Sequence, residues 1–167
     1  VLGFNTSANA TSSTWNVNTP KSISSNVTYY AVTKKDAVTY TATFVANNAT
    51  LVDTANTDSA TKDSCTIAAT YNGTAQSGSC NIKLPTITTS TGYGNAGWYN
   101  ASGTKLGNAE ATISVSASQT ITAKTSANSY ICDAGNYLGA NATTCTKCEA
   151  NSYCPGGELT YSETNDS

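Results

Sequence analysis

Alternating apolar and polar positions dominate the chain and predict β-strands. Between positions 38 and 46, every second residue is apolar and most of the intervening ones are threonine; the apolar set is Tyr40, Ala42, Phe44 and Ala46. Successive side chains of a strand point to opposite faces, so this is the pattern of a half-buried strand. Positions 27 to 32 alternate in a similar way, and no segment shows a sustained helical period. The sequence therefore predicts a mainly β fold.

Two short patterns occur twice along the chain at nearly the same spacing. Gly3-Phe4-Asn5 corresponds to Gly97-Trp98-Tyr99, which lies 94 residues further on, and positions 26–33 correspond to positions 118–125 at a spacing of 92. A constant spacing of this kind is typical of tandem modules, here of roughly ninety residues each. We expect residues 1–36 to be the end of one module and residues 37–126 to be a complete second module. Within the second, we expect Trp98 in the core.

The first two cysteines flank a strong turn signal. Asn72-Gly73 tolerates positive φ at both positions, which favours a tight hairpin turn. Cys65 lies seven residues before Asn72, and Cys80 lies seven residues after Gly73. A hairpin folded about this turn would bring the two cysteines together, so we expect a cross-strand disulfide between them. No histidine and no Cys-x-x-Cys pair lies nearby to indicate a redox or metal site.

Two intervening stretches carry weaker signals. Positions 47–64 are rich in Asn, Asp, Thr and Ala without an apolar stripe, so we expect a loop there, with at most one helical turn. Asp53, Asp58 and Asp63 recur every five residues in it but lack the spacing of a calcium-binding loop, so only a weak, adventitious calcium site is conceivable. Tyr93 and an exposed Tyr99 are candidates for a patch that stacks on carbohydrate, although we favour ordinary packing for them.

From position 126 onward the composition changes, and a cysteine-rich tail follows, which we assign to residues 127–167. Four cysteines and several glycines cannot build a sizeable apolar core and need covalent cross-links. Zinc would need two paired Cys-x-x-Cys knuckles, and only one is present. Disulfides are therefore expected, and four cysteines leave three connectivities open. The cysteines of this tail are Cys132, Cys145, Cys148 and Cys154.

These motifs resemble two known families. The order Gly92-Tyr93, Gly97-Trp98-Tyr99 and then a threonine-rich strand resembles the internalin B-repeat (Listeria-Bacteroides repeat), over about Val38–Thr125 and, truncated, over Val1–Lys35. That resemblance implies tandem small β-grasp-like modules in a large bacterial surface protein. The tail, over about Tyr130–Gly157, resembles the cysteine-rich modules of the tumour-necrosis-factor-receptor and ephrin-receptor-like type. It implies a small disulfide-stapled, loop-rich module that pairs Cys132 with Cys145 and leaves Cys148 for Cys154.

Composition and charge narrow the function classes. Only 11% of residues are charged, the net charge is -2, and all 8 basic residues are lysine, which gives no basic footprint for nucleic acid. No run of 18 apolar residues indicates a membrane span in this segment, and Val1 does not open a signal peptide. Six cysteines without histidine indicate an oxidising compartment.

Little in the sequence indicates catalysis or a bound cofactor. The chain has no histidine to act as a base, and its cysteines are expected to be paired. Glu110 with Lys83 or Lys105 offers two of the three groups of an intramolecular isopeptide bond, but nothing selects a partner Asn. We therefore expect no enzyme, no cofactor and no resident metal. Candidate N-glycosylation sequons, which also arise by chance in such a chain, occur at Asn5, Asn9, Asn26, Asn48, Asn72, Asn100 and Asn141.

The function expected from the sequence is a structural or adhesive segment, a stalk or adhesin, of a large extracellular cell-surface repeat protein. Its partners would be other modules of the same long chain, copies of itself in a fibre, or a host glycan or protein ligand. One alternative is a subunit of an extracellular filament or sheath. Another is an accessory carbohydrate-binding region of a secreted hydrolase, which would bind glycans through exposed aromatic rings.

Overall fold

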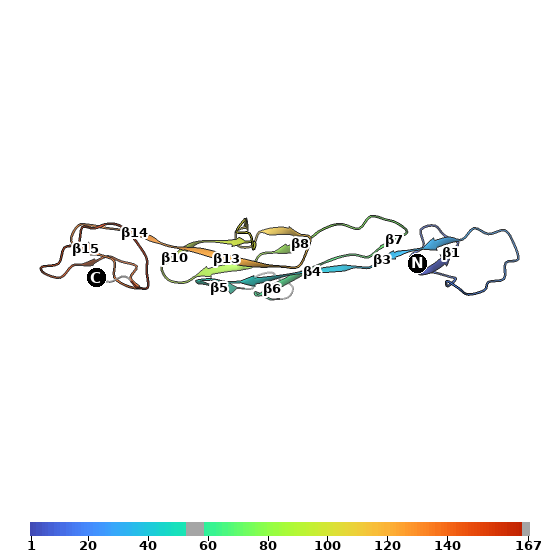
Figure 1. Ribbon diagram of the computed structural model, residues 1–167, viewed down its shortest axis with the longest axis horizontal. Coiled ribbons are helices and arrows are strands. Elements are labelled where there is room, and N and C mark those ends of the chain that lie inside the picture. Colours follow the sequence, from blue (N-terminus) through green and yellow to red (C-terminus); the bar gives the residue numbers. More distant parts are fainter. Residues whose placement is uncertain (53–58, 165–167) are drawn as a thin grey trace. The chain divides into compact units, whose positions relative to one another are not determined.

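The computed structural model describes residues 1–52 and 59–164, and within these ranges every regular element is a β-strand (Figure 1). The fold is mainly β and is cross-linked by disulfides, as the sequence predicts. None of the described residues forms a helix of the length and apolar character that a membrane crossing requires. The chain divides into two compact units: the first comprises Val1–Thr41, Ser64–Asn81 and Ser114–Ser118, and the second Ala42–Asp63, Ile82–Ile113 and Gln119–Ser167.

The strands are short, as expected where turns and Gly or Asn residues with positive φ interrupt the chain often. In order they are β1 (Gly3–Asn5), β2 (Tyr30–Val32), β3 (Lys34–Lys35), β4 (Val38–Val45), β5 (Ala49–Val52), β6 (Lys62–Ile67), β7 (Thr70–Tyr71), β8 (Cys80–Lys83), β9 (Thr86–Thr89), β10 (Tyr93–Tyr99), β11 (Lys105–Gly107), β12 (Thr112–Val115), β13 (Gln119–Ala127), β14 (Ser129–Cys132), β15 (Asn136–Tyr137), β16 (Thr146–Lys147) and β17 (Gly157–Thr160).

The largest sheet has five strands in the order β11-β10-β13-β4-β6. Its strand β13 pairs with β10 in the antiparallel sense and with β4 in the parallel sense, from Gln119↔Ala42 to Thr122↔Val45. Parallel neighbours need a long connection, and here the chain between β4 and β13 supplies β6, β10 and β11 to the same sheet. A strand early in the module and its last strand therefore lie side by side in the middle of the sheet.

The core of the second unit is built around Trp98 on β10, which is fully buried. Its ring lies 5.2 Å from that of Phe44 on β4, at an interplanar angle of 59°. Its indole Nε1–H donates a hydrogen bond of 3.0 Å to the carbonyl of Pro85, so burial leaves no polar group of this side chain unpaired. Ile121 on β13 and Leu84 are also fully buried. The expectation that Trp98 belongs to the core is confirmed.

The prediction of a loop over positions 47–64 is wrong in part. Residues Ala49–Val52 form β5, which pairs antiparallel with β9 so that Leu51 lies opposite Ile87. Within β5, Ala49 and Leu51 are half-buried while the residues between and after them are exposed. Four residues of alternation are too few to distinguish from a loop when the partner strand is distant in sequence. Strand β6 then begins at Lys62.

The hairpin expected about Asn72-Gly73 is also wrong in its strand pairing. Both residues have positive φ, at 53° and 77°, so the turn itself forms. However, β7 before the turn pairs with β3, and β8 after it pairs with β12. Partners that are distant in sequence compete with the local hairpin. Strand β7 forms its backbone pairs with Lys34–Lys35 and not with the residues that follow the turn.

The cysteine-rich tail forms two small antiparallel ribbons, β14 with β17 and β15 with β16. It is joined tightly to the preceding sheet within the second unit. Gly92, at φ +82°, lies against the ring of Tyr161, and a Cβ at this position would collide with that ring. The Asn128 amide donates to the Gly92 carbonyl at 2.8 Å, and the Tyr161 amide donates to the Asn128 carbonyl at 2.8 Å. The joint is therefore packed and hydrogen-bonded.

Truncating Ile121 to alanine tests the core. Ile121 is fully buried, so Ile121→Ala removes packed atoms and leaves a cavity, and we expect a loss of about 2–5 kcal/mol in the free energy of unfolding. Urea unfolding followed by tryptophan fluorescence measures it. Thr120→Ala on the same strand is the matched control, because Thr120 is exposed, and its loss should stay below about 1 kcal/mol. Equal losses in the two variants would contradict the assignment of this core.

Candidate functional site

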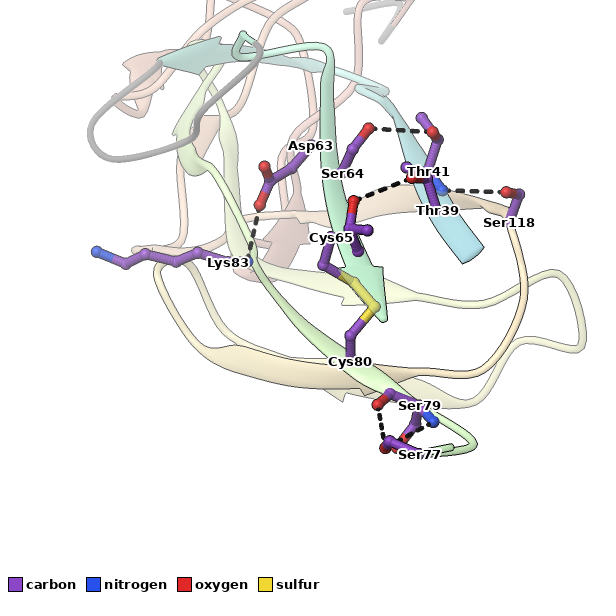
Figure 2. The surroundings of a disulfide bond; sticks show 11 residues. Thr39, Thr41, Asp63, Ser64, Cys65, Ser77, Ser79, Cys80, Lys83 and Ser118 are labelled. Carbon is purple, nitrogen blue, oxygen red and sulfur yellow. Dashed lines mark hydrogen bonds between the residues drawn. A yellow bond between two sulfur atoms is a disulfide. The ribbon is translucent and has the colours of Figure 1, made fainter. Parts of the chain in front are cut away.

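The Cys65–Cys80 disulfide joins β6 to β8 in the first unit and is surrounded by hydroxyl side chains (Figure 2). The two Cα atoms are 5.9 Å apart, within the ordinary range for a disulfide. This is the pair that the sequence favoured, although the hairpin that suggested it does not form. The link closes a loop of sequence separation 15 that contains the Asn72-Gly73 turn.

A ladder of hydroxyl hydrogen bonds lies beside this disulfide (Figure 2). Thr39 and Thr66 share a hydrogen bond of 2.9 Å between their hydroxyls, and Thr41 and Ser64 share one of 3.0 Å. The Thr41 amide also donates to Ser118 Oγ at 3.0 Å. Cross-strand pairs of this kind contribute roughly 0.2–1 kcal/mol each. The many threonines of this chain thus link neighbouring segments as well as favouring the extended backbone.

Asp63, one of the three regularly spaced aspartates, is buried in the second unit and has a structural contact. Its Oδ2 accepts a hydrogen bond of 3.1 Å from the Lys83 amide, as Figure 2 shows. Asp53 and Asp58 lie outside the described residues. Among the residues that the structure does describe, no group of three acidic, cysteine or histidine side chains lies close enough to hold a metal ion.

Two further disulfides hold the cysteine-rich tail. Cys132 pairs with Cys145, and Cys148 pairs with Cys154, as the family resemblance implied. The backbone of Gly135 contacts both cysteines of the second disulfide, because its amide donates to the Cys154 carbonyl and its carbonyl accepts from the Cys148 amide. All six cysteines of the chain are thereby paired. Three disulfides are typical of a protein that folds and remains in an oxidising compartment.

The repeat found in the sequence has the same strand pairing in both copies. In the first copy β1 pairs with β2, and in the second β10 pairs with β13 (Figure 1). The pairs Gly3↔Val32, Phe4↔Ala31 and Asn5↔Tyr30 correspond, at the spacings of 94 and 92, to Gly97↔Lys124, Trp98↔Ala123 and Tyr99↔Thr122.

The correspondence extends to the next strand. The isolated bridge Phe4↔Trp15 in the first copy matches Trp98↔Gly107 between β10 and β11 in the second. Because a slip of one residue would move every side chain to the other face, shared register means that equivalent positions of the two copies point to equivalent faces. The paired segments therefore share strand register, as expected of a tandem repeat.

Asn72 has a structural role that its place in a sequon did not indicate. Its Nδ2 donates to the carbonyls of Ala8 and Ala10, at 3.1 and 2.9 Å, and its Oδ1 accepts from the Thr33 amide at 3.2 Å. These contacts join the first copy of the module to the turn that follows β7, within the first unit. A glycan on Nδ2 would remove one of these donated hydrogens. The sequence indicated only a turn at Asn72. It did not indicate the side-chain partners, because these lie far away in sequence.

The other sequon asparagines differ in their surroundings. Asn9, Asn26 and Asn48 are exposed. Three others make hydrogen bonds through their side chains to nearby or more distant residues of the chain: Asn5 donates to the Ser12 carbonyl, Asn100 accepts from the Thr104 amide, and Asn141 donates to the Glu163 carbonyl. Glycosylation of these positions stays a prediction.

The remaining candidate side chains are placed as follows. The Tyr99 ring lies 5.1 Å from Lys124 Nζ, and the Tyr93 ring packs edge-on against Tyr161 at 5.4 Å, so each has its own partner. Burial, together with the nearby Glu163 carboxylate, raises the pKa of the Tyr93 phenol above its usual value. Lys83 Nζ lies 3.8 Å from Glu110 Oε2, and both side chains are partly exposed, unlike the water-excluded groups of an isopeptide site.

Comparisons with known proteins gave no matching family model, no matching curated protein and no matching solved structure.

Replacing the first disulfide tests its role. We expect the double variant Cys65→Ser/Cys80→Ser to lose about 3 kcal/mol in the free energy of unfolding, because the unfolded chain regains the entropy of a closed loop. Urea unfolding of oxidised samples measures this, and wild-type protein with non-reducing peptide mapping is the control. An unchanged midpoint, or free thiols at these positions in the native protein, would contradict the assignment.

Proposed function

We propose that this chain is a non-catalytic structural and adhesive segment, a stalk, of a large extracellular cell-surface repeat protein. The observation that carries the proposal is the shared strand register of the two module copies. A protein that extends from a surface by repeating one unit needs each unit to fold locally and to contact its neighbours, which is the behaviour of repeat proteins. The resemblance to internalin B-repeats and to extracellular cysteine-rich modules agrees with this proposal.

The joints between successive modules support a mechanical role. Only Thr33 separates β2 from β3, and only Asn128 separates β13 from β14. The last strand of each copy therefore runs almost directly into the first strand of the next segment. Flexible linkers are usually longer and rich in Gly, Ser or Pro. A chain with such short connections transmits tension along hydrogen-bonded backbone rather than through slack segments.

The covalent cross-links support the extracellular location. The chain has little apolar material, and its buried apolar residues are few beside its many hydroxyl-bearing ones. Small modules of this composition are stabilised by disulfides where the surroundings are oxidising. Disulfide bonds inside such modules also stabilise the folded state of a stalk, which makes it harder for proteases to cleave.

Protease treatment of intact cells of the natural source tests the proposal. We expect a protease that cannot enter cells to release peptides of this chain, with Cys65–Cys80, Cys132–Cys145 and Cys148–Cys154 still linked. Intact mass should exceed the 17.1 kDa of the chain, because the proposal places it within a larger protein. A cytoplasmic protein that stays unreleased is the control. Recovery of the chain only from broken cells, with reduced cysteines, would overturn the proposal.

A further inference from the structure

Two adjoining hollows lie within the first unit, around the turn that follows β7. The first has a volume of about 330 Å³ and lies between β3 and the turn. The second has a volume of about 460 Å³ and lies between the turn and the loop that follows β1. Three residues line both hollows: Thr70, Asn72 and Thr74. The hollows therefore meet along the turn, and each is of the size in which proteins hold small organic ligands.

These hollows form where the two copies of the repeat meet in the first unit. The loop after β1 belongs to the first copy, and the turn after β7 belongs to the second. The Asn72 carboxamide holds them together, because it donates to the Ala8 and Ala10 carbonyls and accepts from the Thr33 amide. Ligand sites occur preferentially between structural units that pack against each other.

Thr70 carries a hydroxyl that a ligand could satisfy. Its Oγ1 is buried and forms no hydrogen bond with any residue that the structure describes. A buried hydroxyl without a partner destabilises the folded chain, so its presence calls for an explanation. Because Thr70 lines both hollows, a rotation of its side chain would turn the hydroxyl toward a ligand in either.

Lysine side chains give the first hollow its charge. Lys34 and Lys35 form β3, and both line this hollow. Lys34 Nζ lies 2.7 Å from Asp36 Oδ1, so an acidic partner already balances that charge. Lys35 has no such partner among the described residues, and it lies directly opposite Thr70 in the β3–β7 ladder, so their side chains share one face. An anionic group in this hollow would gain the Lys35 ammonium as its ion partner.

The other lining groups suit the hydroxyls of a sugar. Hydroxyl, carboxamide and aromatic side chains contribute to the two hollows, namely those of Asn9, Thr11, Thr33, Tyr71, Thr74 and Gln76. Hydroxyls and carboxamides both donate and accept hydrogen bonds, as sugar hydroxyls do, and an aromatic ring offers an apolar face. Gln76 is held in place, because its Nε2 donates to the Asp36 and Ala68 carbonyls at 2.9 Å each.

We propose that the two hollows together bind an acidic oligosaccharide. Its carboxylate lies at Lys35, and its neighbouring sugar rings follow Thr70 and Asn72 toward Tyr71. The inference rests on the proposed adhesive function, and it names the class of ligand. One ammonium among neutral groups binds weakly, but weak sites that recur along a repeat protein act together and reach a much higher avidity.

The ligand class is tested by nuclear magnetic resonance titration of the oxidised, isotope-labelled chain. Sialyllactose and tetragalacturonate are the acidic probes, and lactose and maltotetraose are their neutral counterparts. We expect saturable shifts in the amide signals of residues 33–35 and 70–76 with the acidic probes. The neutral probes should bind at least about tenfold more weakly, because they lack the ion pair with Lys35. A short polyglutamate peptide, which has charge without sugar hydroxyls, should be weaker by a similar factor.

Two substitutions separate binding from structure. Lys35→Gln should weaken the binding of the acidic probes at least about tenfold, because it removes the ion partner. Lys147→Gln is the matched control at an exposed lysine of the second unit, and it should leave the affinity unchanged. Thr70→Val removes a hydroxyl while keeping the side-chain volume. It should weaken binding about threefold yet raise the urea midpoint of the free chain, because the buried hydroxyl has no partner there.

Several results would overturn the inference. These are the absence of saturable shifts with both acidic probes up to about 10 mM, equal binding of the neutral probes or of the peptide, and shifts centred on other residues. Equal effects of the two lysine substitutions, or an unchanged affinity after Thr70→Val, would do so as well. Binding by a chain that protease does not release from intact cells would reject the proposed location alone, whereas release without binding would reject this inference alone.

Discussion

The parallel pairing of β4 with β13 is the interaction on which the complete module depends. The strands lie next to each other in the middle of the sheet although most of the module separates them in sequence. Their contact buries Trp98 against Phe44, and the Trp98 indole is satisfied by the Pro85 carbonyl. Ile121 on β13 and Leu84 are fully buried in the same unit. The module closes only when strands that are far apart in sequence have met, which is the slow and cooperative step expected of long-range β pairing.

Cross-links and short joints extend this local stability along the chain. The Cys65–Cys80 disulfide and the hydroxyl pairs beside it hold neighbouring strands that share little apolar surface. Asn72 binds the first copy through its carboxamide, and Tyr161 of the tail packs against the backbone of Gly92, just before β10. Each of these contacts uses one polar or aromatic side chain in place of a broad apolar interface. A chain built in this way can lengthen by adding modules without needing a larger core.

The sequence predicted the features that repeat or that depend on local chemistry. The mainly β fold, the central place of Trp98 and the equivalence of the two glycine-aromatic segments all followed from alternation and spacing. The pairing of β7 with β3 and the existence of β5 did not follow, because short strands select partners through tertiary packing that no local pattern records. The role of Asn72 was missed for the same reason, since its partners Ala8 and Ala10 lie far away in sequence. The disulfide between Cys65 and Cys80 was predicted correctly although the hairpin behind the prediction does not form. The turn between the two cysteines does form, and it returns the chain so that they meet.

The most direct test of the two-copy architecture is amide hydrogen exchange measured residue by residue on the native, oxidised chain. If one structural module occurs twice, and the described residues give a β4-type strand to the second copy alone, the equivalent segments of the two copies must differ in protection. We expect slow exchange over Gln119–Thr122, where β13 is paired with β4, and exchange faster by orders of magnitude over Val27–Tyr29, which lie outside any strand. Equal protection of the two segments would contradict this architecture, because it would mean that Val27–Tyr29 are hydrogen-bonded in a ladder as Gln119–Thr122 are.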